Sequence, residues 1–233
     1  MLTSRSLTIH PMPLGLYVRS YLIRAEGVVL VDAGLPHHGP VFRRALAGLG
    51  VRPADIRLIV ITHGHFDHIG SAREIQEATG APIAIHRRDR RYLEQGVIVV
   101  PPGTSPWGRV LHAGARTVVP FLKLTPAPVA VEVGDAPVDL AGYGIPGRIV
   151  YTPGHTSGST TLLLETGDAF VGDMAVGAGP LRATPALPVL AEDLGRLMES
   201  WQRLIGLGAR TIYPGHGRPF ALEAIRPRLD RPR

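Results

Sequence analysis

The sequence predicts an α/β fold in which functional groups lie where strands end. Apolar runs of strand length alternate with amphipathic stretches of helix length over most of the 233 residues, as in helices packed against sheets. Directly after the run 56–61, the chain reads Thr62-His63-Gly64-His65-Phe66-Asp67-His68. Histidine and aspartate are ligands that zinc and similar metals prefer. Because loops that leave buried strands often carry the chemistry of α/β proteins, this segment predicts a metal site.

The first half of the chain predicts alternating strands and helices. Runs 16–23 and 27–31 have the composition of strands, and Asp32-Ala33-Gly34 ends the second run with turn chemistry. Segment 40–49 repeats its apolar residues at helical spacing and stops before Gly50. Ser71 and Glu74 form the pattern of a capping box, which predicts a helix over 71–79. The other expected elements are a strand at 56–61, a strand at 82–86 and a helix at 87–95.

Segment 96–128 interrupts this alternation. It is apolar but rich in proline, and prolines at this density are expected to exclude a long helix or a central strand. We therefore expect an irregular insertion that forms a lid or a pocket wall; the alternative is a packing excursion without ligand contact. The residues expected to form the wall are Trp107, Val118, Phe121 and Leu122.

The second half predicts mainly short strands, with turns of glycine and proline between them. Leu194, Leu197, Trp201 and Leu204 share one face of an amphipathic segment, which predicts a helix over 190–207. Residues 226–233 are rich in arginine and proline and are expected to form a loose tail. The expected strands are 129–133, 138–140, 148–152, 160–165, 169–171 and 211–213.

The composition is that of one globular domain covering residues 1–233. Hydrophobic residues make up 45% of the chain and charged residues 19%, as in ordinary globular proteins. No apolar run approaches the roughly 18 residues of a membrane span, and the N-terminus lacks the apolar core of a secretory signal. We therefore expect a cytoplasmic protein without membrane contact. The chain has no cysteine, which excludes disulfides and thiolate ligands.

The net charge of +6 comes almost entirely from arginine, since Lys123 is the single lysine. A GC-rich coding sequence explains this bias more simply than binding to nucleic acid, because the sequence contains no basic run with interleaved aromatic residues. We therefore expect a small molecule, rather than nucleic acid, as the binding partner. The protein is expected to be a monomer or a homodimer.

Four further segments share one pattern, in which an apolar run ends in a polar residue beside glycine. Glycine lets the backbone turn sharply or approach another group closely. Because strand ends gather at one edge of a sheet, these side chains can meet the histidine cluster. The four residues are Asp32, His155, Asp173 and His216.

With these motifs in place, the sequence from Val31 to Gly217 resembles the metallo-β-lactamase-fold hydrolase superfamily, especially its glyoxalase II and lactonase-like branch. The resemblance implies a four-layer αββα sandwich and two divalent metal ions per chain. Zinc is the expected metal, with iron or manganese as alternatives. It assigns three ligands to each ion and one shared bridge: His63, His65 and His155; Asp67, His68 and His216; and Asp173.

The resemblance also implies a reaction. A hydroxide that bridges the two ions would attack a carbonyl, while Asp67 orients the nucleophile and passes a proton to the leaving group. Asp173 is expected to serve catalysis by bridging the ions. Asp32 is the candidate acceptor for the second ring nitrogen of a metal-bound histidine; the alternative is a simple turn aspartate.

The expected substrate is a carboxylic ester, lactone or thioester, because the cues for other branches are missing. Many lactonases carry a tyrosine where this chain has Val176, which therefore becomes a candidate pocket residue. Arg182 is a candidate for binding a substrate carboxylate. Two alternative activities remain: a mononuclear iron enzyme like the persulfide dioxygenases, and a phosphodiesterase or nuclease. A metal-binding member without catalysis is a further alternative.

Overall fold

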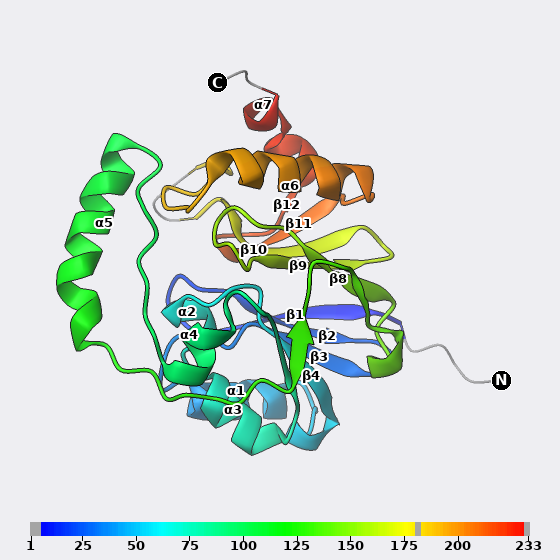
Figure 1. The fold of residues 1–233 in the computed structure, drawn as a ribbon. Helices are drawn as coiled ribbons and strands as arrows, with labels where there is room; N and C mark the ends of the chain where they lie inside the picture. The colour runs from blue at the N-terminus through cyan, green and yellow to red at the C-terminus, as the bar shows by residue number, and fades with distance from the viewer. Residues whose placement is uncertain (1–5, 180–182, 231–233) are drawn as a thin grey trace.

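Two six-stranded sheets lie face to face, and helices cover the outer side of each (Figure 1). The computed structural model describes residues 6–179 and 183–230. Helices α1 (Gly39–Gly48) and α3 (Ala72–Thr79) cover the first sheet, and α6 (Leu194–Gly206) covers the second. The four-layer α/β sandwich predicted from the sequence is confirmed.

The first sheet is antiparallel at one edge and parallel over the rest. Its strands follow chain order, with antiparallel pairing from β1 to β3 and parallel pairing from β3 to β6. The parallel part sends the carboxyl ends of its strands to a common edge. The strands are β1 (Thr8–Met12), β2 (Ser20–Arg24), β3 (Val28–Val31), β4 (Ile56–Val60), β5 (Ile83–His86) and β6 (Val131–Val133).

The second sheet runs in the order β12-β11-β10-β9-β8-β7. Only β10 and β11 pair in parallel, and their register shifts after Phe170 and again after Gly172. The strands are β7 (Val138–Asp139), β8 (Gly147–Tyr151), β9 (Thr160–Leu164), β10 (Asp168–Val176), β11 (Thr211–His216) and β12 (Phe220–Ala221).

Burial on both faces explains why the strands read as continuous apolar runs. In β3, Val28 and Leu30 pack in the core beneath α1 and α3, whereas Val29 and Val31 pack between the sheets. Successive side chains of a strand point to opposite faces, so both sets must be apolar. A third core lies between the second sheet and α6, where Leu197, Trp201 and Leu204 are buried.

The remaining helices are short, apart from α5. Helix α2 carries part of the histidine cluster, and α4 follows β5. Their bounds, with those of the single-turn elements, are α2 (Phe66–Ile69), α4 (Arg90–Gln95), α5 (Pro106–Val118), α7 (Arg226–Leu229), η1 (Pro53–Asp55), η2 (Val119–Phe121), η3 (Ala141–Tyr143) and η4 (Leu222–Ala224).

Helix α5 corrects the prediction that segment 96–128 contains no long helix. Its 13 residues stand at the side of the sandwich, and long connections join it to α4 and β6 (Figure 1). Pro106 occupies the first turn, where its missing N–H is not needed, and the Ser105 hydroxyl accepts a hydrogen bond from the N–H of Gly108 at 3.0 Å. Pro120 lies beyond the helix end. The prolines therefore bracket the helix instead of interrupting it.

Other element boundaries also differ from those predicted. The predicted strand 16–23 begins only at Ser20, and β1 precedes it, although Pro11 lies inside β1. Proline is tolerated there because β1 is an edge strand. The helix predicted from residue 190 begins at Leu194, since the Asp193 side chain accepts from the N–H of Arg196 and caps it. Among the described residues, no helix combines the length and apolarity of a bilayer span.

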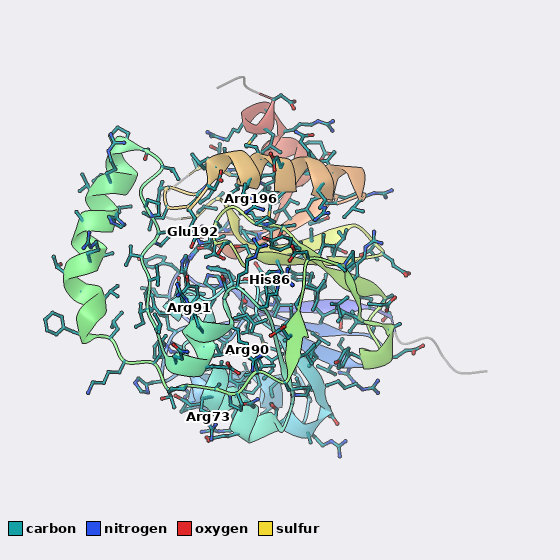
Figure 2. The ribbon with its side chains drawn as sticks, in the orientation of Figure 1. Arg73, His86, Arg90, Arg91, Glu192 and Arg196 are labelled. Atoms are coloured by element: carbon teal, nitrogen blue, oxygen red, sulfur yellow. The ribbon has the colours of Figure 1, made fainter. Side chains whose placement is uncertain are left out.

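A stacked pair of rings helps to hold the two sheets together. His86 ends β5 in the first sheet and lies inside the molecule (Figure 2). Its ring stacks on that of Tyr151, which ends β8 in the second sheet, with centroids 4.4 Å apart and planes 7° from parallel. Arg88 adds a hydrogen bond from its guanidinium to the Tyr151 hydroxyl at 2.7 Å. This histidine therefore has a structural role.

We predict that Trp201→Ala lowers the free energy of unfolding by about 3–5 kcal/mol, the usual range for a buried tryptophan. Trp201 is fully buried, and its indole N–H donates to the Met174 carbonyl at 3.3 Å. Equilibrium urea unfolding followed by circular dichroism measures the loss. Trp107→Ala is the matched control, because Trp107 is 63% exposed on α5 and its loss should cost less than about 0.5 kcal/mol. Equal losses of unfolding free energy in both variants would contradict the burial of Trp201 in α6 and the exposure of Trp107.

Candidate metal centre

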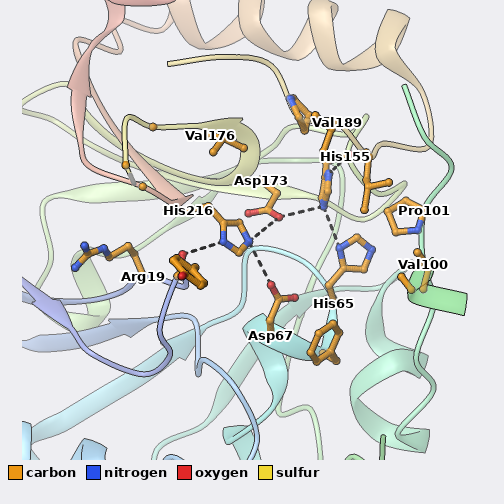
Figure 3. Close-up of a pocket in the computed structure, with 18 of the residues that line it drawn as sticks. Arg19, His65, Asp67, Val100, Pro101, His155, Asp173, Val176, Val189 and His216 are labelled. Carbon is orange, nitrogen blue, oxygen red and sulfur yellow. Dashed lines mark hydrogen bonds and ion pairs between the residues drawn. The ribbon is translucent and has the colours of Figure 1, made fainter. Parts of the chain in front are cut away.

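Side chains from four chain segments meet at one edge of the sandwich, between the two sheets (Figure 3). The parallel pairs β3–β4 and β10–β11 bring their carboxyl ends to this edge. His63 and His65 follow β4, Asp67 and His68 lie in α2, His155 follows β8, Asp173 lies within β10, and His216 ends β11.

The ligand atoms form two triads. His63, His65 and His155 make up the first, and Asp67, His68 and His216 make up the second. Within each triad the nitrogen and oxygen atoms lie within 4.8 Å of one another. These are the two sets of ligands that the resemblance assigns to the two ions.

Asp173 lies between the triads and contacts both. Its Oδ2 is 3.6 Å from His155 Nε2 and 3.3 Å from His216 Nε2, and its Oδ1 is 3.3 Å from His68 Nε2. One carboxylate can therefore serve both sites. Gly172, the residue before it, has a φ of 53° and lies against Thr62 and His63, so a larger residue there would press on the first triad.

Three of the histidines are oriented through the ring nitrogen that faces away from the centre. Nδ1 of His155 is 2.9 Å from the Leu190 carbonyl, and Nδ1 of His216 is 2.9 Å from the Tyr17 carbonyl. Because a carbonyl only accepts, each Nδ1 must carry a proton, which makes Nε2 the nitrogen that can offer a lone pair to a metal. Nδ1 of His68 likewise lies 2.8 Å from Asp32 Oδ2.

Asp32 also orients His63, through Thr62. The Thr62 hydroxyl donates to Asp32 Oδ2 at 2.8 Å, and the same hydroxyl oxygen lies 3.1 Å from His63 Nδ1. Since the hydroxyl proton is already used, His63 Nδ1 must be the donor, which leaves Nε2 free to bind a metal. Asp32 further accepts from the Thr62 N–H at 2.8 Å. Its hydrogen bonds therefore reach one ligand in each triad.

Asp89, for which the sequence predicted no role, joins the two loops of the first triad. Its carboxylate accepts from the Gly64 N–H at 2.8 Å and from the Thr156 hydroxyl at 2.7 Å. Gly64 lies between the candidate ligands His63 and His65, and Thr156 follows the candidate ligand His155. Asp89 is fully buried, although it lies among four arginines in sequence. A single acidic residue in that basic cluster was the only available signal.

Electrostatics keep the first triad in the form that binds metal. Burial lowers the pKa of His63 well below its usual range, and the neighbouring histidines lower it further. Burial and His155 lower the pKa of His65 to about 3, and burial lowers that of His155. These imidazoles are therefore neutral at pH 7, as metal ligands must be.

The second triad behaves in the opposite way. Burial disfavours a charge on His68 and His216, but nearby carboxylates, led by Asp173, outweigh it. The pKa of His68 therefore rises well above its usual range, and that of His216 rises to about 10. Burial would raise the pKa of Asp67, but His68 and His216 hold it at about 2. Without a metal, protons on these histidines balance the carboxylates.

Unpaired buried atoms show that the centre fits metal ions. Among the described residues, His63 Nε2, His68 Nε2 and Asp173 Oδ1 are buried without a hydrogen-bond partner. Such atoms are costly unless something binds them. They converge from both triads, and imidazole with carboxylate is a suitable donor set for zinc. Divalent cations would satisfy these atoms and replace the protons as counter-charges.

A cavity of about 670 Å³ opens over the metal centre. His65, Asp67, His155, Asp173 and His216 form its polar floor (Figure 3). Its walls are mostly apolar and come from residues 16–17, 99–101, 115, 119, 176–179 and 188–190. The metal centre is thus open to a molecule with an apolar body.

The structure corrects the predicted pocket wall. Segment 96–128 does line the cavity, but through Val99, Val100, Pro101, Ala115 and Val119. In the described part of the chain, none of the four residues predicted to form the wall lines the cavity; they are Trp107, Val118, Phe121 and Leu122. Three of them, Trp107, Val118 and Phe121, are 63%, 58% and 83% exposed. For the residues in α5 the reason is helical phase, because Ala115 and Val119 lie one turn apart on the side that faces the cavity. Phe121 and Leu122 lie beyond the end of α5. Val176 lines the cavity, and Arg182 lies outside the described residues.

Comparison with known proteins identifies relatives over most of the chain. The family model described as the metallo-beta-lactamase superfamily matches residues 14–216. The probable metallo-hydrolase YflN of Bacillus subtilis is 30% identical over 207 residues, covering 82% of this chain and 76% of YflN. The probable metallo-hydrolase MJ0888 of Methanocaldococcus jannaschii is 28% identical over 202 residues, covering 85% of this chain and 86% of MJ0888.

Solved structures resemble the fold at lower identity. The B3 metallo-beta-lactamase BLEG-1 has a TM-score of 0.69 and 20% identity, with coverage of 96% of this chain and 100% of that chain. The metallo-beta-lactamase family protein TTHA1429 of Thermus thermophilus has a TM-score of 0.65 and 23% identity, with coverage of 96% and 77%. These similarities show the fold alone.

We predict that Gly215→Ala weakens metal binding by at least about tenfold, as changes beside metal ligands commonly do. A Cβ at this position would collide with the His68 ring and lie 2.6 Å from Asp173 Oδ1. Zinc titration against a competing chelator measures the effect. Gly206→Ala is the matched control, because open space surrounds that position in α6. It should leave zinc affinity unchanged, and its effect on the free energy of unfolding should be neutral or stabilising by up to about 1 kcal/mol. Wild-type zinc affinity in Gly215→Ala would contradict this geometry.

We also predict that loading metal-free protein with zinc at pH 7 releases at least about two protons per chain, two from His68 and His216 and any further one from ionisation of metal-bound water. Both pKa values lie above their usual range in the metal-free state, so both rings are protonated at pH 7 and must lose that proton to bind. The release should decrease as the pH rises towards the His216 value of about 10. Calorimetric titration in buffers of different ionisation enthalpy counts the protons. A result independent of buffer would refute the assigned charge states.

Proposed function

Because the chain belongs to the metallo-beta-lactamase superfamily of metal-dependent hydrolases, we propose that it cleaves a carboxylic ester, a lactone or a thioester. The observation that carries this proposal is the pair of ligand triads sharing Asp173 beneath an apolar cavity. A small-molecule substrate fits a cavity of this size. The proposed location in the cytoplasm rests on the composition of the chain.

The proposed cofactor is a pair of divalent cations, with zinc first and iron or manganese as alternatives. When bound, the cations would polarise the scissile carbonyl and lower the pKa of bound water, so that hydroxide is available as the nucleophile near neutral pH. His63, His65 and His155 would hold one cation, and Asp67, His68 and His216 the other. Asp173 would hold both, since its Oδ2 lies near a histidine of each triad and its Oδ1 lies near His68.

Asp67 is the proposed positioning group for the attacking water. Its carboxylate lines the cavity, with Oδ2 3.2 Å from His216 Nε2. Its low pKa keeps it ionised at pH 7, so it can accept a hydrogen bond from the water and orient it towards the carbonyl. The proton would then pass along Asp67 to the leaving group, on the side of the cavity where His216 lies.

The apolar walls favour acyl substrates over nucleic acids. Val99, Val100, Ala115, Val119 and Val189 line the cavity, and such side chains would contact an acyl group and exclude bulk water. A polynucleotide would instead need several positive charges along a groove. The cavity offers an aliphatic surface beside the metal centre.

Metal analysis together with a substrate panel tests the proposed function. Two zinc ions per chain and turnover of thioesters, lactones or aryl esters would support it. One iron per chain, without hydrolysis, would favour the mononuclear dioxygenase. Turnover of phosphodiesters with no ester cleavage would favour the nuclease. Removal of the metal with a chelator should abolish the hydrolysis, and added zinc should restore it.

We predict that Asp173→Ala lowers kcat/KM for an aryl ester by at least about 100-fold, because both cations lose a ligand. Metal content should fall below two ions per chain, while the circular dichroism spectrum is unchanged. Asp230→Ala is the control for loss of one carboxylate, because Asp230 is exposed at the end of α7. Wild-type activity and metal content in Asp173→Ala would exclude the bridging role.

A further inference from the structure

The cavity has two chemically different sides. Beyond His65 and His155, its wall is formed by aliphatic side chains such as Val100, Pro101 and Val189, whereas Arg19 lies on the other side, beside His216 (Figure 3). Arg218, two residues after His216, lines the same cavity. Apart from the metal-binding residues, these two arginines are its only charged lining residues in the described part of the chain.

Backbone hydrogen bonds hold both arginines next to the second triad. Val18 forms a bridge with His216, and the Arg19 N–H donates to the Gly215 carbonyl at 2.7 Å. The Arg218 N–H donates to the Ala178 carbonyl at 2.8 Å. Arg19 thus lies directly before β2 in the first sheet, and Arg218 lies two residues after the end of β11 in the second. Elements fixed to the metal centre therefore hold the backbones of both arginines beside the cavity that their exposed side chains line.

The charges of the two arginines are not neutralised within the described residues. No ion pair there includes Arg19 or Arg218, whereas Arg52, Arg73 and Arg90 each pair with a carboxylate. The carboxylates that line the cavity, Asp67 and Asp173, face the histidines instead. Guanidinium groups bind carboxylate and phosphate oxygens through directed, charge-assisted hydrogen bonds.

We infer that Arg19 and Arg218 bind an anionic group, carboxylate or phosphate, on the leaving portion of the substrate. This inference rests on the proposed function, in which Asp67 passes a proton to the leaving group on the His216 side. The aliphatic wall on the opposite side takes the acyl chain. The substrate class is therefore an open-chain ester or thioester that joins an apolar acyl group to an acidic alcohol or thiol.

Two thioesters that differ only in charge test the inference. The zinc-loaded protein is given S-hexanoyl-3-mercaptopropionate and the corresponding propionamide, and thiol release is followed. The acid should be cleaved with a kcat/KM at least about tenfold higher, as expected from one charge-assisted interaction. S-hexanoyl-2-mercaptoethyl phosphate is the phosphate arm, and its rank against the acid identifies which anion the site prefers. Equal rates for the acid, the phosphate and the amide would overturn the inference.

Substitutions locate the preference on the two arginines. Arg19→Gln and Arg218→Gln should each reduce the ratio of acid to amide by about three- to tenfold, and the double variant should bring it close to one. Arg44→Gln removes the same charge from the exposed side of α1 and should leave the ratio unchanged. An unchanged ratio in the double variant would overturn the inference. A thioester with its carboxylate at the far end of the acyl chain is a further control. If it were preferred over its amide as strongly as the acid on the thiol portion is, the anion site could not be assigned to the leaving group.

A binding measurement separates this inference from the proposed function. The thioether 3-(hexylthio)propionate and its amide have no bond to hydrolyse, and calorimetry measures their affinities for the zinc-loaded protein. Tighter binding of the acid by at least about tenfold, lost in the double variant, would support the anion site even if no thioester were cleaved. In that case only the proposed function would fail. Discrimination that survives in the double variant would mean that the metals hold the anion, and would overturn the inference.

Discussion

The buried carboxylate of Asp32 is the constraint on which the metal centre depends. Parallel pairing of β3 with β4 places it beside Thr62, and its own N–H donates to the Val60 carbonyl at 2.9 Å. From there it orients His68 directly and His63 through the Thr62 hydroxyl. Its φ of 60° costs on the order of 1 kcal/mol for a residue with a Cβ, and three hydrogen bonds from Thr62 and His68 stabilise it. One strained residue thus organises a ligand in each triad.

The electrostatics of the centre follow from its burial. Neutral imidazoles of the first triad present lone pairs, whereas the carboxylates around the second triad retain protons on His68 and His216. A cation entering the second site must displace those protons, so metal affinity and pH are linked. Beyond the metals, the cavity changes from an aliphatic wall to two arginines. This difference between an apolar side and a positively charged side would align a substrate across the metal centre before any bond breaks.

Most of the fold could be predicted because its central strands are buried on both faces. The run Val28–Val31 reads as a strand because one half packs under the helices and the other half between the sheets. Helix α5 could not be predicted from the number of prolines, since the positions of Pro106 and Pro120 at its two ends are what matter. Asp89 was invisible for another reason: its partners, Gly64 and Thr156, are 25 and 67 residues away in sequence.

The order of the amino acids is enough to predict the ligand types and the places where they leave their strands. Side chains only a few residues apart, from His63 to His68, must lie close together in space, whatever the rest of the chain does. Which ring nitrogen of His155 and His216 faces the metal centre depends on packing, because Leu190 and Tyr17 supply the opposing carbonyls from distant segments. Packing also explains why Ala115 and Val119, rather than Trp107, line the cavity, and why Arg19 lies beside His216. Those outcomes depend on strand register and helix phase, which arise only when the layers pack.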